Sequence, residues 1–177
     1  MSDTVLCVDM DGTLIYNDTL RQALWRFIQW YPWRLGWVLF WLSRGRAYLK
    51  QQLAQRVHLN IASLPYNRTF INWLIVEKNR GRKIILATAM DKKVATAVAS
   101  HIGIFDAVLA SDGKTNLRAQ AKAQLLNRYY GRKKYIYAAN ARDDLAVWRH
   151  ARYAIVVNAN VRVLKRAQRI ADIIKVF

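Results

Sequence analysis

A pair of acidic residues, Asp9 and Asp11, follows the apolar run of residues 5–8. Alternation along an extended chain points both carboxylates to the same side, and Gly12 lets the backbone turn sharply after them. Like charges held this close need a cation between them or a shifted pKa, and Mg²⁺ prefers such oxygen ligands. A strand ending in a solvated turn could carry the same acids, but the full run Asp9-Met10-Asp11-Gly12-Thr13-Leu14 favours a metal-dependent site.

This hexapeptide resembles the first motif of the haloacid dehalogenase (HAD) superfamily, whose members are mostly Mg²⁺-dependent phosphatases. The later motifs of the family follow in order over nearly the whole chain. An apolar run ends at Thr88, and Lys122 lies near the start of a predicted helix. Asn140 and Asp144 follow a further apolar run, where the family usually has Gly-Asp-x-x-x-Asp, so that Ala139-Asn140 departs from the family pattern.

The resemblance implies a role for each of these residues. Asp9 would be the nucleophile that forms an aspartyl-phosphate, and Asp11 would be the general acid and base. Mg²⁺ would be held by the Asp9 carboxylate, the Asp11 carbonyl and Asn140, with Asp144 bound directly or through water. Thr88 and Lys122 would stabilise the transferring phosphoryl group. The implied phosphate-binding set is Met10, Gly12, Thr88, Ala89 and Lys122.

Other interpretations of these residues stay open at the level of sequence. Thr88 could be an ordinary strand end, and Lys122 could be one more surface lysine in a basic chain. Asn140 is neutral and therefore a weaker ligand than aspartate, which would lower metal affinity or abolish activity. Asp143 and Asp144 also allow a paired-acid version of the fourth motif, shifted by one residue.

Composition indicates a single domain with a strongly basic surface. The chain has 177 residues, of which 54% are hydrophobic, enough to bury a sizeable core. Its single cysteine, Cys7, lies within the first apolar run and suits a reducing cytoplasm, and no signal peptide is expected before Asp9. A net charge of +18 attracts polyanions such as anionic lipid, phosphorylated substrates or nucleic acid.

Strands and helices are predicted to alternate from residue 67 onward, as in an α/β fold of Rossmann type. We expect a parallel sheet with helices on both faces and ligands at the carboxyl ends of its strands. This HAD-like core comprises residues 1–16 and 67–177. The predicted strands are 83–88, 107–110, 134–138 and 153–157; the predicted helices are 67–80, 91–102, 116–130 and 143–150, with a basic helix from about residue 160 finishing the chain.

Residues 17–66 do not fit this alternation and are predicted to form a small helical cap inserted after the first strand. The cap holds five of the seven tryptophans and seven basic residues. Its apolar segment 33–42 is too short to span a bilayer, which takes about 20 residues, yet Trp, Phe and Leu mixed with Arg are typical of an interfacial helix. The alternative is a cap that packs its tryptophans against the core. These tryptophans are Trp25, Trp30, Trp33, Trp37 and Trp41.

A narrower resemblance is to the HAD-like domain that precedes UbiA-type polyprenyl prenyltransferases in bacteria. It implies a phosphatase acting on a phosphorylated lipid or lipid-linked sugar, cytoplasmic and peripheral to the inner face of the membrane, beside a fused or associated prenyltransferase. Two alternatives are a soluble small-molecule phosphatase and a non-catalytic regulatory or membrane-binding domain. Nucleic acid is a weaker candidate partner, because no recognised nucleic-acid motif is present.

Overall fold

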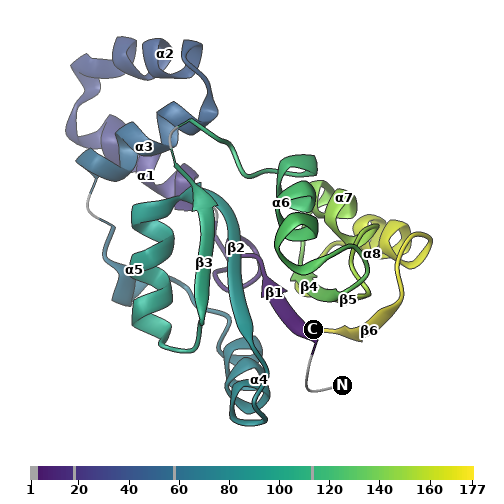
Figure 1. Cartoon of the computed structure of the whole chain (residues 1–177). Helices are drawn as coiled ribbons and strands as arrows, with labels where there is room; N and C mark the ends of the chain where they lie inside the picture. The colour runs from purple at the N-terminus through teal and green to yellow at the C-terminus, as the bar shows by residue number, and fades with distance from the viewer. Residues whose placement is uncertain (1–3, 18, 58, 113) are drawn as a thin grey trace.

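The computed structural model describes residues 4–177 apart from residues 18, 58 and 113. At the centre of this described part lies a parallel sheet with the strand order β3-β2-β1-β4-β5-β6 (Figure 1). Strands later in the chain add to one side of β1 and then to the other, so the direction of the sheet reverses beside β1, where α/β sheets commonly bind ligands. The strands are β1 (Val5–Val8), β2 (Ile84–Asp91), β3 (Ala107–Ser111), β4 (Tyr135–Ala139), β5 (Tyr153–Val156) and β6 (Ile173–Val176).

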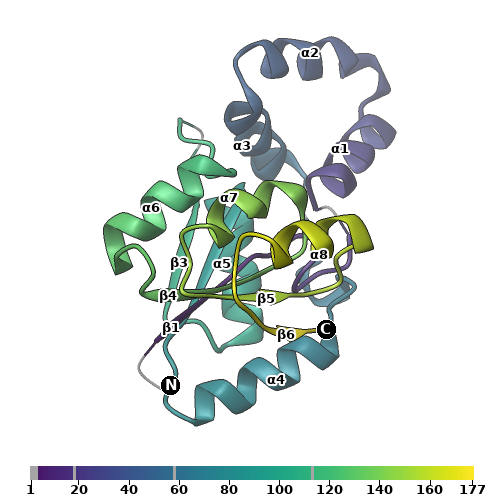
Figure 2. The same cartoon turned by 90° about the vertical axis from the view of Figure 1, so that its right-hand side faces the viewer.

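Helices cover both faces of the sheet (Figure 2), which confirms the predicted α/β fold. Because successive side chains of a strand point to opposite faces, Leu6 and Val8 of β1 join one core cluster and Cys7 joins the other. The first cluster packs under α4 (Arg68–Asn79) and α5 (Lys92–Ile102). The second packs under α6 (Gln120–Tyr130), α7 (Leu145–Trp148) and α8 (Val161–Gln168).

Side-chain caps fix where several helices begin. The N–H of Lys93 donates to the carboxylate of Asp91 at 2.9 Å, which confirms the predicted cap of α5. Asn67 and Asn160 accept backbone N–H groups at the starts of α4 and α8 in the same way. Gly103 ends α5 in the left-handed region, at φ +75°, where glycine has no steric penalty.

Several predicted boundaries are wrong. The strand expected to end at Thr88 continues to Asp91, so Thr88 lies inside β2. The helix expected from residue 116 begins only at Gln120, and residues 116–119 belong to the loop between β3 and α6. The basic helix near the end of the chain stops at Gln168, and the chain continues into β6, which pairs in parallel with β5. The β-branched residues Ile173, Ile174 and Val176 favour this strand, and it is short enough to be missed beside a helix of strong basic character.

The cap consists of three helices that follow β1 and lie over the carboxyl ends of the strands (Figures 1 and 2). They have a small core of their own, in which Phe27, Val38 and Trp41 pack with Leu49 and Leu53. The helices are α1 (Thr19–Trp30), α2 (Leu35–Ser43) and α3 (Arg46–Arg56), with short 3₁₀ turns η1 (Pro32–Arg34) before α2 and η2 (Ile61–Ser63) after α3.

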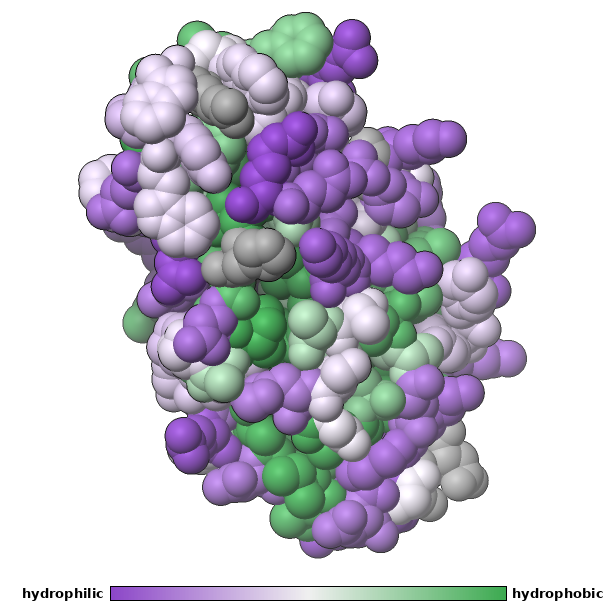
Figure 3. Space-filling view, turned by 90° about the vertical axis from the view of Figure 1, so that its left-hand side faces the viewer, coloured by the Kyte–Doolittle hydropathy of each residue, from purple (hydrophilic) through white to green (hydrophobic). Residues whose placement is uncertain are grey.

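The alternative in which the cap buries its tryptophans does not hold for four of the five. Trp41 is 3% exposed inside the cap core, whereas Trp25, Trp30, Trp33 and Trp37 are between 47% and 75% exposed. Pale aromatic and green aliphatic side chains gather over the cap, at the top of Figure 3, next to purple hydrophilic ones. No helix in the described residues is long and apolar enough to cross a membrane. We call the exposed set on η1 and α2 the apolar cap face: Trp33, Leu35, Trp37, Leu39, Phe40 and Leu42.

Candidate active site between the core and the cap

The loop after β1 forms a tight turn that presents Asp9 at the edge of the sheet. The carbonyl of Met10 accepts the N–H groups of Thr13, Leu14 and Ile15, and Gly12 adopts φ +75°, which a side chain would disfavour. The N–H of Gly12 donates to the carbonyl of Ile15 at 2.6 Å, so in this structure Gly12 and Met10 shape the loop through their backbone groups.

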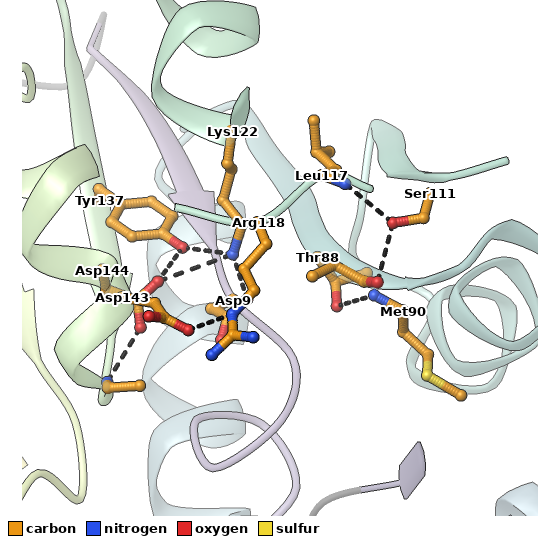
Figure 4. Close-up of polar contacts among 12 residues, drawn as sticks. Asp9, Thr88, Met90, Ser111, Leu117, Arg118, Lys122, Tyr137, Asp143 and Asp144 are labelled. Atoms are coloured by element: carbon orange, nitrogen blue, oxygen red, sulfur yellow. Dashed lines mark hydrogen bonds and ion pairs between the residues drawn. The ribbon is translucent and has the colours of Figure 1, made fainter. Parts of the chain in front are cut away.

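The carboxylate of Asp9 is paired with the ammonium group of Lys122 from α6. Lys122 Nζ lies 2.6 Å from Asp9 Oδ1 and 2.8 Å from the hydroxyl oxygen of Tyr137 (Figure 4). Tyr137 donates in turn to Asp144 Oδ1 at 2.8 Å, and Lys122 Nζ is 3.7 Å from that oxygen. Lys122 is 3% exposed, so it is a buried partner of two acids and not a surface lysine.

Burial and charge act against each other at this pair. Burial raises the pKa of Asp9 to about 7; the Lys122 ammonium opposes this rise, while Asp144 adds to it. Burial alone would lower the pKa of Lys122, but the nearby carboxylates of Asp9 and Asp144 outweigh it and the pKa is raised. The site therefore keeps its lysine charged, and Asp9 needs positive charge beside it to stay ionised at neutral pH.

Asn140 lies directly against the turn at Gly12. A Cβ built on Gly12 would come within 1.9 Å of Asn140 Nδ2, so only glycine leaves room for the amide. Asn140 Oδ1 is buried and has no hydrogen-bond partner among the described residues. A buried acceptor without a donor is costly, and a cation would satisfy it.

The oxygen ligands at this site suit Mg²⁺, which does not need a complete shell of side-chain carboxylates. The described residues hold no group of three or more His, Cys, Asp or Glu side chains that could bind a metal. Asp9, Asn140 and a backbone carbonyl are oxygen donors, and Mg²⁺ usually takes only one or two carboxylates and keeps several waters. The donor set therefore fits Mg²⁺, with Asn140 Oδ1 as the atom that most needs it.

The two adjacent acids of the fourth motif have different surroundings. Asp144 is 4% exposed and accepts from Tyr137 on one oxygen and from the N–H of Ala141, at 2.9 Å, on the other. Asp143 points to the guanidinium of Arg118 in a half-exposed ion pair, a kind of contact that adds little stability. The short 3₁₀ turn η3 (Arg142–Asp144) thus turns Asp144, and not Asp143, toward Lys122 (Figure 4).

Thr88 lies in β2, one strand away from Asp9, and is 1% exposed. Its hydroxyl oxygen accepts the N–H of Met90 at 3.1 Å. The carbonyl of Ala89 accepts two side-chain donors, Ser111 Oγ at 2.8 Å and Lys50 Nζ at 2.5 Å. Lys50 comes from α3, so a cap residue contacts β2 at the second motif.

Asp11 connects the core to the start of the cap. Its Oδ1 accepts both the N–H of Thr19, at 3.0 Å, and the hydroxyl of Thr19, at 2.8 Å. Thr19 is the first residue of α1, where unpaired N–H groups and the helix dipole favour a negative charge. The second acid of the motif thus lies between the turn after β1 and the cap.

A cavity of about 680 Å³ joins these groups. It is lined by most of the predicted site residues, by Arg46, Lys50 and Arg118, and by aliphatic side chains from the cap. Its wall therefore combines charged groups, mostly from the core, with apolar side chains from the cap. The predicted residues on its wall are Asp9, Asp11, Gly12, Thr88, Ala89, Lys122, Asn140 and Asp144; Met10 is fully buried behind the turn.

Sequence reasoning assigned no role to Tyr137, Lys50 or Ser111. Tyr137 lies within a predicted strand, where a buried tyrosine needs a partner for its hydroxyl, but its partner is seven residues away. Lys50 is the sole lysine among residues 17–66, a weak signal in a cap rich in arginine. Ser111 shows no sequence signal, because its contact with Ala89 depends on the pairing of β2 with β3.

Comparisons with known proteins agree with this fold. No protein-family model matches the chain. The uncharacterized protein y4nM of Sinorhizobium fredii is 32% identical over 157 residues, which are 89% of this chain and 30% of that protein, so the chain spans less than a third of that relative.

Two solved structures have the same architecture. A phosphoserine phosphatase holding an analogue of a phospho-aspartyl intermediate gives a TM-score of 0.66 at 15% identity, over 100% of this chain and 94% of that chain. A haloacid dehalogenase-like hydrolase, SP0104 of Streptococcus pneumoniae, gives 0.65 at 14% identity, over 99% and 93%. These similarities establish a HAD-like α/β fold.

Proposed function

We propose that this protein is a phosphohydrolase of the HAD type, which hydrolyses a phosphate monoester through a phosphorylated Asp9. The observation that carries the proposal is the buried contact of Lys122 with Asp9 at the carboxyl end of β1. An acid with a raised pKa in a cavity, beside a specific charge partner, is a feature of catalytic sites. The HAD-like fold of its structural neighbours supports this chemistry.

In the proposed first step, a carboxylate oxygen of Asp9 attacks phosphorus and the bond from phosphorus to the ester oxygen breaks. The carboxyl group of Asp11 gives its proton to the departing oxygen. Lys122 offsets the negative charge of the phosphoryl group, and the hydroxyl of Thr88, which lines the same cavity, donates a hydrogen bond to it.

In the second step, the Asp11 carboxylate takes a proton from a water molecule, which attacks phosphorus. The bond from phosphorus to Asp9 then breaks, which restores the Asp9 carboxylate and releases phosphate. Tyr137 and the N–H of Ala141 hold Asp144 in place beside Lys122 throughout, so the pair of charges at Lys122 keeps its geometry.

We propose Mg²⁺ as the cofactor. Asp9, the backbone carbonyl of Asp11 and Asn140 would hold it, with Asp144 acting directly or through water, and the bound ion would neutralise charge on the phosphoryl oxygens. The unpaired Oδ1 of Asn140 and the raised pKa of Asp9 both support a cation here.

The substrate that we propose is a phosphorylated lipid or lipid-linked sugar, met at an anionic membrane surface. The charged groups on the cavity wall suit the phosphate, and its aliphatic side chains suit an apolar chain. Leu42 belongs both to this wall and to the apolar cap face, so the two apolar surfaces are continuous. The aliphatic wall comprises Leu20, Leu24, Val38, Leu42 and Leu49.

A soluble small-molecule phosphatase is the second candidate, supported by the net charge of +18, which draws anionic substrates to any site on this surface. A non-catalytic domain is less compatible with a buried Asp9 that is paired with Lys122 inside a cavity. A polyprenyl prenyltransferase, fused or associated, stays a predicted partner of the lipid-phosphatase proposal.

The decisive experiment measures hydrolysis of p-nitrophenyl phosphate with Mg²⁺ by the wild type, Asp9→Asn and Asp172→Asn. We expect kcat of Asp9→Asn to fall by about 1,000-fold or more, because the nucleophile is lost, while the exposed Asp172 control stays at the wild-type rate. Mass spectrometry of the acid-quenched wild type should find one phosphoryl group on Asp9. Equal rates for the wild type and Asp9→Asn, or full activity in chelator, would refute the proposed mechanism.

A further inference from the structure

The peptide that joins Ala89 to Met90 is held at both ends. Its carbonyl oxygen accepts Lys50 Nζ at 2.5 Å and Ser111 Oγ at 2.8 Å, and its N–H donates to Thr88 Oγ1 at 3.1 Å. Ser111 is itself fixed, because its hydroxyl oxygen accepts the N–H of Leu117 at 3.0 Å (Figure 4). Rotation of this peptide would break all three contacts at once.

Of the two donors to that carbonyl, Ser111 belongs to the core and Lys50 to the cap. Lys50 is 8% exposed and extends from α3 into the cavity that contains Asp9. The next residue, Gln51, donates to the carbonyl of Asp112 at 3.5 Å, so α3 contacts the backbone beyond β3 as well as β2. The contact of Lys50 with Ala89 therefore depends on where the cap lies over the core.

The anchored peptide determines what the Thr88 hydroxyl can do. Because Thr88 Oγ1 already accepts the N–H of Met90, its own hydrogen is directed elsewhere, and Thr88 lines the cavity. A hydroxyl has one hydrogen and two acceptor sites, so accepting from Met90 leaves it as a donor toward a ligand. If the peptide moved, the Thr88 hydroxyl would lose the N–H of Met90 and would no longer be held as a donor toward the ligand.

We infer that Lys50 is a positioning residue, which couples closure of the cap to the orientation of the Thr88 hydroxyl by holding the carbonyl of Ala89. The expected effect of Lys50 on catalysis rests on the proposed function, whereas its effect on the peptide between Ala89 and Met90 does not. The cap would then do more than enclose the substrate, because α3 holds the part of β2 that carries the Thr88 hydroxyl. Preorganised donors of this kind stabilise charge that develops in the transition state.

The first test needs no substrate. Amide hydrogen exchange of Met90, followed by NMR in the full chain, should become at least about tenfold faster in Lys50→Met than in the wild type, because its peptide is no longer anchored from the cap. The amide of Leu86, inside β2, and the control variant Gln55→Met, exposed on α3, should show wild-type exchange. Unchanged exchange at Met90 would overturn the inference, whether or not the protein hydrolyses phosphate.

The second test uses p-nitrophenyl phosphate, which has no second anionic group for Lys50 to bind. We expect kcat of Lys50→Met to fall about tenfold with KM little changed, since the Thr88 donor acts mainly in the transition state. Lys50→Arg should recover part of the loss by reaching the same carbonyl. A normal kcat in Lys50→Met, with KM raised for substrates of higher charge, would show instead that Lys50 binds substrate.

These outcomes separate the two proposals. If Asp9→Asn matches the wild type while Met90 exchange responds to Lys50→Met, the phosphatase mechanism fails and the coupling of the cap to β2 stands. If Asp9→Asn is inactive while Met90 exchange is unchanged, the mechanism stands and the coupling fails.

Discussion

The core and the cap place their polar and apolar side chains in opposite ways. The core buries charge, with Asp9, Lys122 and Asp144 all less than 10% exposed at the carboxyl end of the sheet. The cap exposes apolar surface, with Trp33 at 75% and Leu39 at 67%. Globular proteins do the reverse of both by default, because buried charges are costly and large apolar patches mark contact surfaces.

The difference shows which features of each region need a function to explain them. In the core, the buried groups Asp9, Lys122 and Asp144 each lie beside a partner of the opposite sign, so this arrangement is stable only if all three are present. In the cap, the rings of Phe27 and Trp41 pack at a tilted angle in a small core, with centroids 5.1 Å apart. Trp37 contacts Trp41 edge-on, with ring centroids 6.0 Å apart, but is itself 47% exposed. Packing stability thus explains why Trp41 is a tryptophan. The exposed surface of Trp37 is better explained by contact with another molecule.

The largest expected effect is on the core. Lys122→Met should lower kcat by about 100-fold or more, because a positive charge at the phosphoryl group is lost. It should also reduce the free energy of unfolding by about 3 kcal/mol near pH 8, since two acids stay buried without their cation. Urea unfolding measures the second effect, with the exposed Lys165→Met as control.

The stability cost of Lys122→Met should depend on pH. Burial already raises the pKa of Asp9 to about 7, and removal of the ammonium would raise it further. The folded variant then holds a proton that the unfolded chain releases above its ordinary pKa of about 4, so stability falls as pH rises from about 5 to about 8. An equal cost at both pH values would show that the pair is not electrostatically coupled.

The next largest effect distinguishes the buried tryptophan of the cap from an exposed one. Trp41→Ala should reduce the free energy of unfolding by about 3 kcal/mol, because it empties the cap core and removes the ring beneath Arg56, whereas Trp37→Ala should cost about 1 kcal/mol or less. Hydrogen exchange in α1 and α3 would localise the loss to the cap. Equal costs for the two tryptophans would mean that the packing of α2 differs from that described.

A third effect concerns the metal. Asn140→Asp should tighten Mg²⁺ binding by about tenfold, because a charged ligand replaces a neutral one. Calorimetric titration measures this directly, and Asp143→Asn should bind Mg²⁺ as the wild type does, since Asp143 pairs with Arg118 outside the buried network. If Asp143→Asn abolishes the metal dependence while Asn140→Asp leaves it unchanged, the paired-acid register of the fourth motif is the correct one.

The smallest expected effect on stability comes from substitutions on the apolar cap face, which test whether that face binds membranes. Trp37→Ser combined with Leu39→Ser should change the free energy of unfolding by less than about 1 kcal/mol. It should nevertheless weaken sedimentation with anionic lipid vesicles at high salt about tenfold, because apolar insertion survives screening while basic attraction does not. Tyr129→Ser, which removes an exposed aromatic side chain on α6, is the control. Absence of sedimentation at low salt would favour the soluble phosphatase.

Much of the fold and site could be predicted from the sequence. Apolar runs of four to eight residues closed by polar residues predict strands, and in a parallel sheet their ends must meet, which brings Asp9, Thr88 and Asn140 to one edge. Lys122 needed the resemblance to the HAD family, since one lysine among 29 basic residues has no distinguishing pattern.

Other features depend on contacts that no local pattern encodes. Asp143 and Asp144 are neighbours of the same type, and only the 3₁₀ turn decides which of them is buried. The segment 33–42 is apolar almost all round, broken only by Arg34 and Gly36, so its period could not indicate that Trp41 faces inward and Trp37 outward. Lys50 reaches Ala89 across 39 residues of sequence, a contact that exists only after the cap has folded over the sheet.

The buried Cys7 is a natural probe of how often the core of the protein opens. Its thiol is fully enclosed in the strand that carries Asp9, and burial raises its pKa, so the reactive thiolate is suppressed in the folded chain. A thiol reagent can therefore modify the native protein only when the sheet opens at its centre. The labelling rate of this one residue would report how often the whole core opens, separately from any loosening of the cap.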